Sequence, residues 1–413
     1  MTDNHWKEYI KFCVKLMGYC VYQVSRLLPR SRSKWCFDSL QDFGNTWFLF
    51  IDIVENHKDI RAISITQDKS YRDLRRKGFE AYHWLSLKGI YHCMTAGAYI
   101  VTINTRQINP YLSGGALYVN LWHGNGLKAC VWNSDKSAIT MFGKNLEQIA
   151  SSRYCRISLF YTYFRKPDLA LSTSPFLTAK LFAPQYRIAC DRFIETNFPR
   201  NAVFSWTKER IFDFISRYES PQTLELVRDI IPRYSKTYIY MPTWRDSGSD
   251  IFSRSGMDFE RLNELLKRNN ELFLLKLHPL MKLDHDDMSR YENISVIEQY
   301  SDAYTVLPFT DMLITDYSSV YYDYLQLNRE MIVFCFDLDE YLSENRELMF
   351  DYEEFMPGRR AESFDELLTL LADHTDCHVP ERERIMHLFW ESYDNGMDIA
   401  EEIKTRLSRN YVK

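Results

Sequence analysis

The chain has 413 residues, of which 46% are hydrophobic and 15% aromatic, and this content excludes a disordered protein. The formal net charge is -5, from 51 basic and 56 acidic residues, so the chain lacks the overall positive field of a nucleic-acid binder. Any anion site must therefore be local. The nine cysteines are scattered and never spaced Cys-x-x-Cys, which argues against a disulfide framework or a zinc ribbon and favours a reducing cytoplasm.

Residues 1–34 predict a basic amphipathic helix. Between residues 6 and 28 apolar side chains recur at helical spacing on one face, while lysines and Arg26 lie on the other. The apolar face comprises Ile10, Cys13, Val14, Met17, Cys20, Val21, Val24 and Leu28. Arg30, Arg32 and Lys34 extend the positive charge, and neither a cleavable signal nor a membrane-spanning segment is recognised. Such a helix lies in the headgroup region of an anionic leaflet or packs on the body of the protein.

The rest of the chain alternates short apolar runs with helical segments, which is typical of α/β domains. In residues 35–205 the expected buried strands are 62–66, 99–104, 116–122 and 169–172. In residues 206–380 they are 237–244, 272–278, 294–297, 312–315 and 331–336, with expected helices at 259–268 and 318–327. We therefore expect two doubly wound units, linked by the mainly helical stretch 205–234, and one long helix within a closing segment, 381–413.

Ligands of open parallel sheets bind beyond the carboxyl ends of the strands, and four expected strands end in chemically suggestive residues. The first strand end is Trp122-His123-Gly124-Asn125-Gly126. Its glycines let the backbone approach a ligand, and His123 can accept a proton near neutral pH. The alternative is a core histidine beside a tight turn.

The second and third strand ends carry cations. Pro242-Thr243-Trp244-Arg245 offers a hydroxyl and a guanidinium, whose fork suits phosphate oxygens but is also common in surface ion pairs. Lys276-Leu277-His278 places a lysine and a histidine on one face of a strand, or forms a solvated strand end.

The fourth strand end is Asp316-Tyr317-Ser318-Ser319, followed by a helix that carries Asp323. The free N–H groups of the helix start and the two serine hydroxyls predict an anion site. In the alternative interpretation Asp316 or Ser318 is only a helix cap. Asp323 could accept a hydrogen bond from a ribose or glycerol hydroxyl.

Together and in this order, the motifs resemble those of the CDP-glycerol glycerophosphotransferase family, which includes teichoic acid primases and polymerases. The matching segments are Trp122-His123-Gly124 with Leu127-Lys128, Phe198-Pro199-Arg200-Asn201, Pro242-Thr243-Trp244-Arg245, Lys276-Leu277-His278-Pro279, Ile314-Thr315-Asp316-Tyr317-Ser318-Ser319 with Asp323-Tyr324, and Phe350-Asp351-Tyr352-Glu353-Glu354 with Pro357-Gly358. The resemblance covers about residues 35 to 375. One departure is Asn125-Gly126, where the family usually has Thr-Pro.

The resemblance implies a GT-B architecture, with an acceptor-side Rossmann-like domain (35–205) and a nucleotide-donor domain (206–380) facing a cleft. It also implies a peripheral enzyme at the cytoplasmic face of the membrane, with a CDP-polyol donor and a lipid-linked or polymeric acceptor. The residues it places at the donor are Trp122, His123, Gly124, Asn125, Gly126, Arg200, Pro242, Thr243, Lys276, Leu277, His278, Ser318, Ser319 and Asp323.

The residues and the resemblance give one mechanism: an acceptor hydroxyl attacks the phosphorus that bears the polyol, and CMP leaves. His123 would remove the proton, while Lys276, His278, Arg200, Arg245 and the helix start at Ser318 would hold the diphosphate. We expect no metal and no other cofactor. Residues 284–287 look like a solvated loop, and His374, Cys377 and His378 lack a fourth zinc ligand.

Two other functions fit the sequence less well. One is a GT-B glycosyltransferase that uses a nucleotide sugar, and the other is a catalytically silent, membrane-associated scaffold, against which the intact His123 and His278 speak. The sequence does not show whether the polyol is glycerol, ribitol or another, whether the enzyme primes or extends the polymer, or whether the product is a wall polymer or a capsule. It also leaves open the oligomeric state and which histidine is the base.

Overall fold

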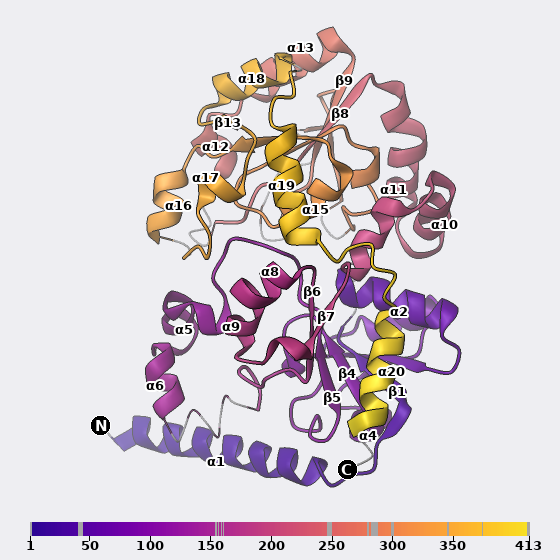
Figure 1. Ribbon diagram of the computed structural model, residues 1–413, viewed down its shortest axis with the longest axis vertical. Coiled ribbons are helices and arrows are strands. Elements are labelled where there is room, and N and C mark those ends of the chain that lie inside the picture. Colours follow the sequence, from indigo (N-terminus) through magenta and orange to yellow (C-terminus); the bar gives the residue numbers. More distant parts are fainter. Residues whose placement is uncertain are drawn as a thin grey trace. The chain divides into compact units, whose positions relative to one another are not determined.

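Two parallel β-sheets organise the chain in the computed structural model (Figure 1). The structure describes residues 2–39, 44–152, 155, 157, 159, 161–245, 250–278, 281, 288–298, 301–344, 347–373 and 375–410, without the side chains of 2–9, 11, 137, 140, 344 and 410. The chain divides into two compact units. Unit 1 comprises Met1–His123, Cys130–Arg200 and Ser392–Lys413, and unit 2 comprises Gly124–Ala129 and Asn201–Glu391. The main boundary therefore falls after Arg200, whereas we expected it after residue 205.

Unit 1 is built on a seven-stranded parallel sheet with the order β3-β2-β1-β4-β5-β6-β7. Its strands are β1 (Ser31–Phe37), β2 (Arg61–Thr66), β3 (Ala81–His83), β4 (Ala96–Val101), β5 (Leu117–Asn120), β6 (Leu169–Ser172) and β7 (Phe193–Glu195). The register pairs Tyr99 of β4 with Tyr118 of β5, and both side chains are buried. The order reverses between β1 and β4, which makes their carboxyl ends a topological switch point.

The helices of unit 1 are α1 (Thr2–Ser25), α2 (Asn45–Asn56), α3 (Tyr71–Arg76), α4 (Leu87–Thr95), α5 (Asp135–Phe142), α6 (Leu146–Ser151), α8 (Pro175–Leu177), α9 (Ala183–Tyr186) and α20 (Ile399–Asn410). The expectation of a helical segment reaching residue 34 is wrong, because β1 begins at Ser31. Trp35 is fully buried in this strand, and the ammonium of Lys34 donates to the hydroxyl of Thr95 at 2.8 Å. A search of the described helices finds none long and apolar enough to cross a membrane.

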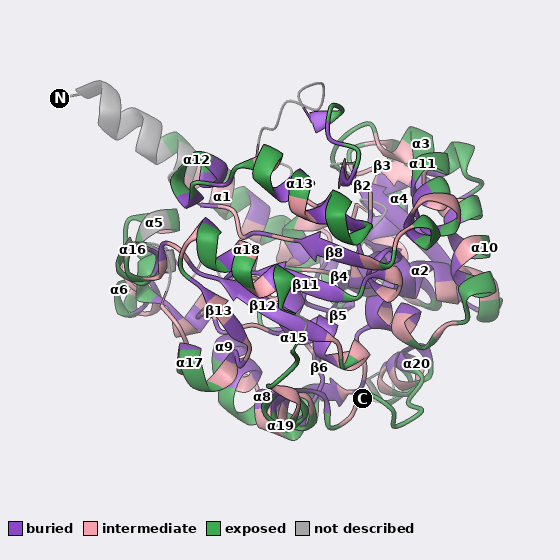
Figure 2. Cartoon of the chain, turned by 90° about the horizontal axis from the view of Figure 1, so that it is seen from above, coloured by how far each residue is buried: buried purple, intermediate pink, exposed green. Residues whose placement is uncertain are grey.

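Unit 2 is built on a six-stranded parallel sheet with the order β10-β9-β8-β11-β12-β13. Its strands are β8 (Lys236–Tyr240), β9 (Glu271–Leu275), β10 (Ile294–Val296), β11 (Met312–Thr315), β12 (Glu330–Phe334) and β13 (Arg359–Ala361). Its helices are α10 (Lys208–Tyr218), α11 (Pro221–Glu225), α12 (Ile251–Ser255), α13 (Phe259–Asn269), α15 (Val320–Tyr324), α16 (Leu338–Glu344), α17 (Tyr352–Phe355), α18 (Phe364–Ala372) and α19 (Val379–Trp390). Figure 2 shows β8, β11 and β12 in the colour of buried residues, as expected for the central strands of a parallel sheet.

Helix α13 shows how local sequence sets these elements. The carboxylate of Asp258 accepts hydrogen bonds from the backbone N–H groups of Glu260 and Arg261 in the first turn, and Asn270 ends the helix in the left-handed conformation. Leu262 and Leu266, four residues apart, are fully buried in the core of unit 2. The expected helix at 259–268 is confirmed.

The C-terminal region differs from the expectation of one long helix within the closing segment 381–413. Helix α19 ends at Trp390 and belongs to unit 2, whereas α20 begins at Ile399 and belongs to unit 1. Between them Gly396 adopts a positive φ of 65°, and the carboxylate of Asp398 accepts from the N–H groups of Ala400 and Glu401 at the start of α20. A turn and a new helix cap therefore interrupt the helical pattern.

Candidate functional site

Three neighbouring strands of unit 2 end in residues that the sequence analysis singled out. The strands β9, β8 and β11 are adjacent and parallel, so their carboxyl ends share one edge of the sheet. Thr243 follows β8, His278 follows β9, and Ser318 and Ser319 follow β11. The topology gathers these polar side chains at one edge of unit 2.

Ser318 and Ser319 are half-buried and lie immediately before α15. Ser319 occupies the cap position, but its side chain makes no cap hydrogen bond. Within the described part of the chain neither serine hydroxyl has a hydrogen-bond partner. Because α15 has only five residues, its dipole is shorter than the expected helix 318–327 would give. The hydroxyls are therefore available to a ligand, and the interpretation of these serines as structural caps is not supported.

A buried ion-pair cluster fixes the backbone beneath these residues. The guanidinium of Arg245 donates to both carboxylate oxygens of Asp337, at 2.7 and 2.9 Å, and lies 2.9 Å from a carboxylate oxygen of Asp316. Asp316 in turn accepts from the backbone N–H of Thr243 at 2.9 Å. Burial by itself lowers the pKa of Arg245, but the two carboxylates outweigh it and raise the pKa, so the side chain stays charged.

The structure corrects the role expected of Arg245. Its side chain is only 2% exposed and its guanidinium is held by two carboxylates and the carbonyl of Thr243, so it positions the strand end instead of binding a diphosphate. The hydroxyl of Thr243 is different. It is buried and has no hydrogen-bond partner among the described residues, which leaves it available to a ligand.

Asp323 also differs from its expected role. Its carboxylate is fully buried and accepts from the side-chain amide of Asn201 at 3.0 Å and from the hydroxyl of Tyr304 at 2.5 Å. A ribose or glycerol hydroxyl therefore does not reach it. Asp323 instead holds Asn201, the residue that follows Arg200 in the Pro-Arg-Asn motif.

The lysine of the third motif supports a neighbouring loop. The ammonium of Lys276 donates to the backbone carbonyls of Glu298 and Ser301, at 2.5 and 2.7 Å, and burial lowers its pKa to about 8. The side chain of Leu277 is buried in the core of unit 2. Only His278 of this segment exposes its side chain at the strand end.

A loop from the first half of the chain completes this edge of unit 2. Residues 124–129 belong to unit 2, where Lys128 forms an antiparallel bridge with Leu348 and the N–H of Ala129 donates to the carbonyl of Glu347 at 2.8 Å. At Gly126 an added Cβ would lie 3.6 Å from the Cβ of Ser319. The Asn125-Gly126 segment therefore lies against the second serine of the fourth motif.

Lys128 and His278 lie at the same edge, and Lys128 brings positive charge to it. The ring of His278 stacks on Trp244 with centroids 5.9 Å apart, and desolvation together with the charge of Lys128 lowers its pKa. The ammonium of Lys128 lies 5.4 Å from the ring centroid of Tyr341. A bound anion would stabilise the charge of Lys128 and favour protonation of His278, so the edge suits a phosphate. The sequence analysis noted Lys128 in a motif but gave it no role.

In unit 1, His123 follows β5 on a strained turn and its side chain is exposed. Trp122 adopts a left-handed φ of 54°, rare for so large a residue, and its ring lies 4.2 Å from that of His123. The side-chain oxygen of Asn120 accepts from the N–H of Trp122 at 2.8 Å and from the hydroxyl of Tyr186 at 3.2 Å. The expected exposed histidine is present, and the alternative of a core histidine is wrong.

Asn45, at the start of α2, was missed by the sequence analysis. Its fully buried amide donates to the carbonyls of Leu121 and Trp122, at 3.2 and 3.0 Å, and its oxygen accepts from the backbone N–H of Arg200 at 3.4 Å. One side chain thus holds the backbone at both His123 and Arg200, which is itself buried. The available signal was Gly44-Asn45-Thr46 before an apolar helix, which indicates only a helix start.

The motifs agree with a comparison against protein families. A family model described as CDP-Glycerol:Poly(glycerophosphate) glycerophosphotransferase matches residues 20–401. The chain belongs to this family. The resemblance inferred from the motifs is therefore confirmed, over a longer stretch than the motifs alone covered.

Named relatives in the CDP-glycerol glycerophosphotransferase family differ in length. A teichoic acid glycerol-phosphate transferase of Staphylococcus aureus is 31% identical over 305 residues, which cover 71% of this chain and 72% of the relative. A teichoic acid poly(glycerol phosphate) polymerase of Bacillus spizizenii is 24% identical over 93% of this chain and 95% of its own length. A polymerase of the same description from Bacillus subtilis is 26% identical, but the chain spans only 45% of it.

The fold also matches that of a solved protein. A structure of the wall teichoic acid polymerase TagF, in a histidine-to-asparagine variant, superposes with a TM-score of 0.76 over the whole of both chains at 19% identity. At this identity the match shows the fold alone. Structures of that variant soaked with CDPG match with TM-scores of 0.73 and 0.72.

The described residues hold one group of metal-ligand type outside the strand ends. His57, Asp398 and Glu401 bring ligand atoms within 4.8 Å of one another, but His57 pairs with both carboxylates and Lys404 pairs with Glu401 at 2.7 Å. These pairs explain the group without an ion. Residues 284–287 and His374 lie outside the described residues. The expectation that the family reaction needs no metal here stays a prediction.

Proposed function

We propose that this chain transfers glycerol phosphate, or a related polyol phosphate, from a CDP-glycerol-type donor to a lipid-linked or polymeric acceptor and releases CMP, in the synthesis of teichoic acid or a capsule-like polymer. Membership of the glycerophosphotransferase family supports the reaction class. The observation that carries the donor assignment is the phosphate-suited edge of unit 2, where Ser318, Ser319, Thr243, Lys128 and His278 meet.

In the proposed reaction an acceptor hydroxyl oxygen attacks the phosphorus that bears the polyol. The new P–O bond forms as the P–O bond to CMP breaks, and CMP leaves with that bond's electron pair. His123 of unit 1 takes the hydroxyl proton. In unit 2 the serine hydroxyls, Thr243, the imidazole of His278 and the positive charge of Lys128 bind the phosphates and stabilise the charge that develops on CMP.

The revised roles of buried residues belong to the same proposal. Arg245 and Asp316 position Thr243, and Asp323 positions Asn201, so these residues support the donor site from beneath. The GT-B architecture is part of the proposal as well, and the presence of two parallel sheets in separate units supports it.

The experiment that tests the reaction is a screen of CDP-glycerol, CDP-ribitol and UDP-sugars for acceptor-dependent release of nucleotide. We expect CMP release with a CDP-polyol. Release of UDP in place of CMP would establish the glycosyltransferase alternative. Binding of a CDP-polyol without turnover against any teichoic-acid-type acceptor would favour the silent scaffold.

We also propose that helix α1 binds the cytoplasmic leaflet of the membrane peripherally. One side packs on unit 1, since Tyr19 and Tyr22 contact Tyr161, and any Cβ at Gly18 would come within 2.5 Å of the Tyr111 ring. The other side exposes a row of large apolar side chains. They are Ile10, Val14, Met17, Val21, Val24 and Leu27. An amphipathic helix with such a face inserts into the headgroup region of a bilayer.

Less of the positive charge near this helix is accessible to a membrane than the sequence implied. Arg30 donates to the backbone carbonyls of Cys93 and Leu112, at 2.9 and 2.7 Å, and Lys34 is buried. Apolar contact should therefore dominate membrane binding. We expect the double substitution Met17→Glu and Val24→Glu to abolish binding to phosphatidylglycerol vesicles, while Leu85→Glu, an equally exposed apolar position in unit 1, leaves it intact. Unchanged binding by the double variant would refute this role for α1.

A further inference from the structure

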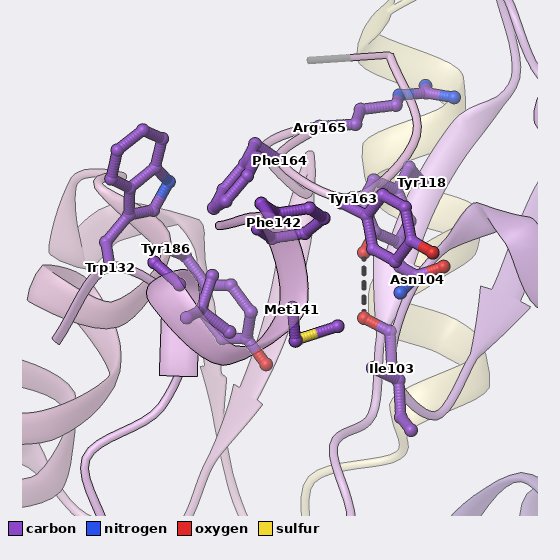
Figure 3. A pocket seen from close by; sticks show the side chains of 12 residues that line it. Ile103, Asn104, Tyr118, Trp132, Met141, Phe142, Tyr163, Phe164, Arg165 and Tyr186 are labelled. Atoms are coloured by element: carbon purple, nitrogen blue, oxygen red, sulfur yellow. Dashed lines mark hydrogen bonds between the residues drawn. The ribbon is translucent and has the colours of Figure 1, made fainter. Parts of the chain in front are cut away.

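Unit 1 contains a cavity of about 120 Å³ to which the proposed reaction assigns no role (Figure 3). Its walls are mostly apolar and aromatic. Figure 3 shows Trp132 and Tyr186 on one side, Tyr163 and Ile103 on the other, and Met141 between them. Met141 is 61% exposed, so it marks the rim where the cavity opens to solvent. The cavity therefore has an apolar interior and an apolar mouth.

Three of the polar side chains in the wall, Tyr118, Tyr186 and Arg165, already bond within the protein. The hydroxyl of Tyr118 accepts from Asn120 at 3.2 Å, and the hydroxyl of Tyr186 donates to the same residue at 3.2 Å. Arg165 donates to the backbone carbonyls of Ser113 and Ala116, at 3.0 and 3.1 Å. A ligand rich in hydroxyl groups would lose more hydration in this mostly apolar cavity than the few remaining polar groups could replace. A hydrocarbon loses nothing on entering.

The cavity lies between two features that the proposed function uses. The ring of Tyr186 meets Trp122, the neighbour of His123, edge-on with centroids 5.9 Å apart. On the opposite side the guanidinium of Arg165 lies over the rings of Tyr118 and Tyr22, with Tyr22 on helix α1. Continuous packing within unit 1 thus connects α1 through the cavity wall to the turn that carries His123.

We propose that this cavity binds a hydrocarbon segment of a lipid, drawn from the bilayer beside α1. An apolar protein cavity of about 150 Å³ holds a benzene ring, so this one would hold about five carbon atoms. This inference rests on the proposed function in one respect: the lipid comes from the membrane that α1 is proposed to bind. Chain binding here would keep a lipid-linked acceptor or a neighbouring lipid beside the His123 turn, without taking part in bond making.

The test is photo-crosslinking with two probes. The first is phosphatidylglycerol with a diazirine in its acyl chain, incorporated in phosphatidylglycerol vesicles. The second is a diazirine-bearing decanoic acid below its critical micelle concentration, which reaches the cavity without a membrane. Labelled residues are located by mass spectrometry of peptides. We expect labels within 131–142 and 163–165 with both probes, and on α1 with the vesicles.

Two matched variants on helix α5 separate the cavity from the surface around it. Met141→Glu places a charge at the rim and should reduce cavity labelling roughly tenfold, because a hydrocarbon chain entering past the rim would strip water from that carboxylate. Ile139→Glu makes the same change at a 53% exposed position that does not line the cavity, and should label like the unmodified protein. Both positions are exposed, so folding should be unaffected.

The outcomes distinguish this inference from the proposed membrane association. Failure of the soluble probe to label the cavity, or equal labelling of the Met141→Glu and unmodified proteins, would overturn the cavity assignment even if vesicles label α1. Labelling of the cavity by the soluble probe, without any labelling of α1 by vesicles, would sustain the cavity and refute the membrane role of α1.

Discussion

The substitution Asn45→Asp tests whether one buried amide sets the geometry of the His123 turn. The change keeps the shape of the side chain but replaces its N–H donors with an oxygen. The carbonyls of Leu121 and Trp122, now 3.2 and 3.0 Å from those donors, would face a carboxylate. The side-chain oxygen that accepts from the backbone N–H of Arg200, at 3.4 Å, would be retained. The perturbation therefore acts selectively on the turn that carries His123.

The magnitude follows from the groups that lose their partners. Each buried carbonyl left without a donor costs about 1–3 kcal/mol. Relaxing Trp122 from its left-handed φ of 54° returns about 1–3 kcal/mol. Local movement of the turn therefore costs less free energy than disruption of the surrounding core. Since a displacement of about 1 Å can cost about 10²-fold in rate, we expect kcat to fall by about that factor while the KM for the donor changes little.

The assay is steady-state CMP release at several concentrations of the CDP-polyol, at a temperature where circular dichroism shows the variant folded. Asn56→Asp is the matched control, because Asn56 lies exposed at the other end of α2, where its side-chain amide donates to Asp52 at 2.7 Å. The control should retain normal kcat. A normal kcat for Asn45→Asp, or a loss that follows the unfolded fraction, would refute the positioning role.

Four other predictions follow from the site and the fold. His123→Ala should lower turnover by ~10²-fold or more without loss of folding, because the side chain is an exposed general base; near-normal turnover would remove it from the mechanism. Ser319→Asp should weaken binding of the CDP-polyol roughly tenfold or more in a titration, whereas unchanged affinity would reject the phosphate contact. Activity should survive EDTA, and loss of turnover that magnesium restores would show that a metal takes part. Burial raises the pKa of Asp38 to about 6 from 3.8, so the native state binds more protons between these values and stability falls as pH rises through them. Asp38→Asn should therefore add roughly 3 kcal/mol to the free energy of urea unfolding at pH 7 and almost none at pH 3.5, and a gain independent of pH would contradict this origin.

The candidate site was predictable where it depends on strand ends. An apolar run followed by polar residues locates the carboxyl end of a buried strand, and parallel neighbours bring such ends together. This logic placed Thr243, His278, Ser318 and Ser319 on one edge of unit 2, as the sheet order confirms. It needs only local sequence, because the period of a buried strand and the turn that ends it are both local signals.

Side-chain partners could not be predicted in the same way. Arg245 and Asp323 looked like ligand-binding residues because a guanidinium and a carboxylate suit phosphates and hydroxyls. In the structure Arg245 is bonded to Asp337, 92 residues away in the sequence. Asp323 is bonded to Asn201, 122 residues away. Such long-range pairing leaves no periodic trace in the sequence. Burial decides the role of a charged residue, and a charge inside a protein must be paired.

The departure at Asn125-Gly126 can now be interpreted from its surroundings. Gly126 does not adopt the left-handed region that favours glycine, and an added Cβ would meet Ser319 at an ordinary contact distance of 3.6 Å. Its backbone N–H donates to no group among the described residues. The proline that the family usually has here would therefore sacrifice no hydrogen bond, and neither steric space nor internal bonding requires glycine. What this chain gains is one additional N–H donor beside Ser319, at the edge where the phosphates of the donor are proposed to bind.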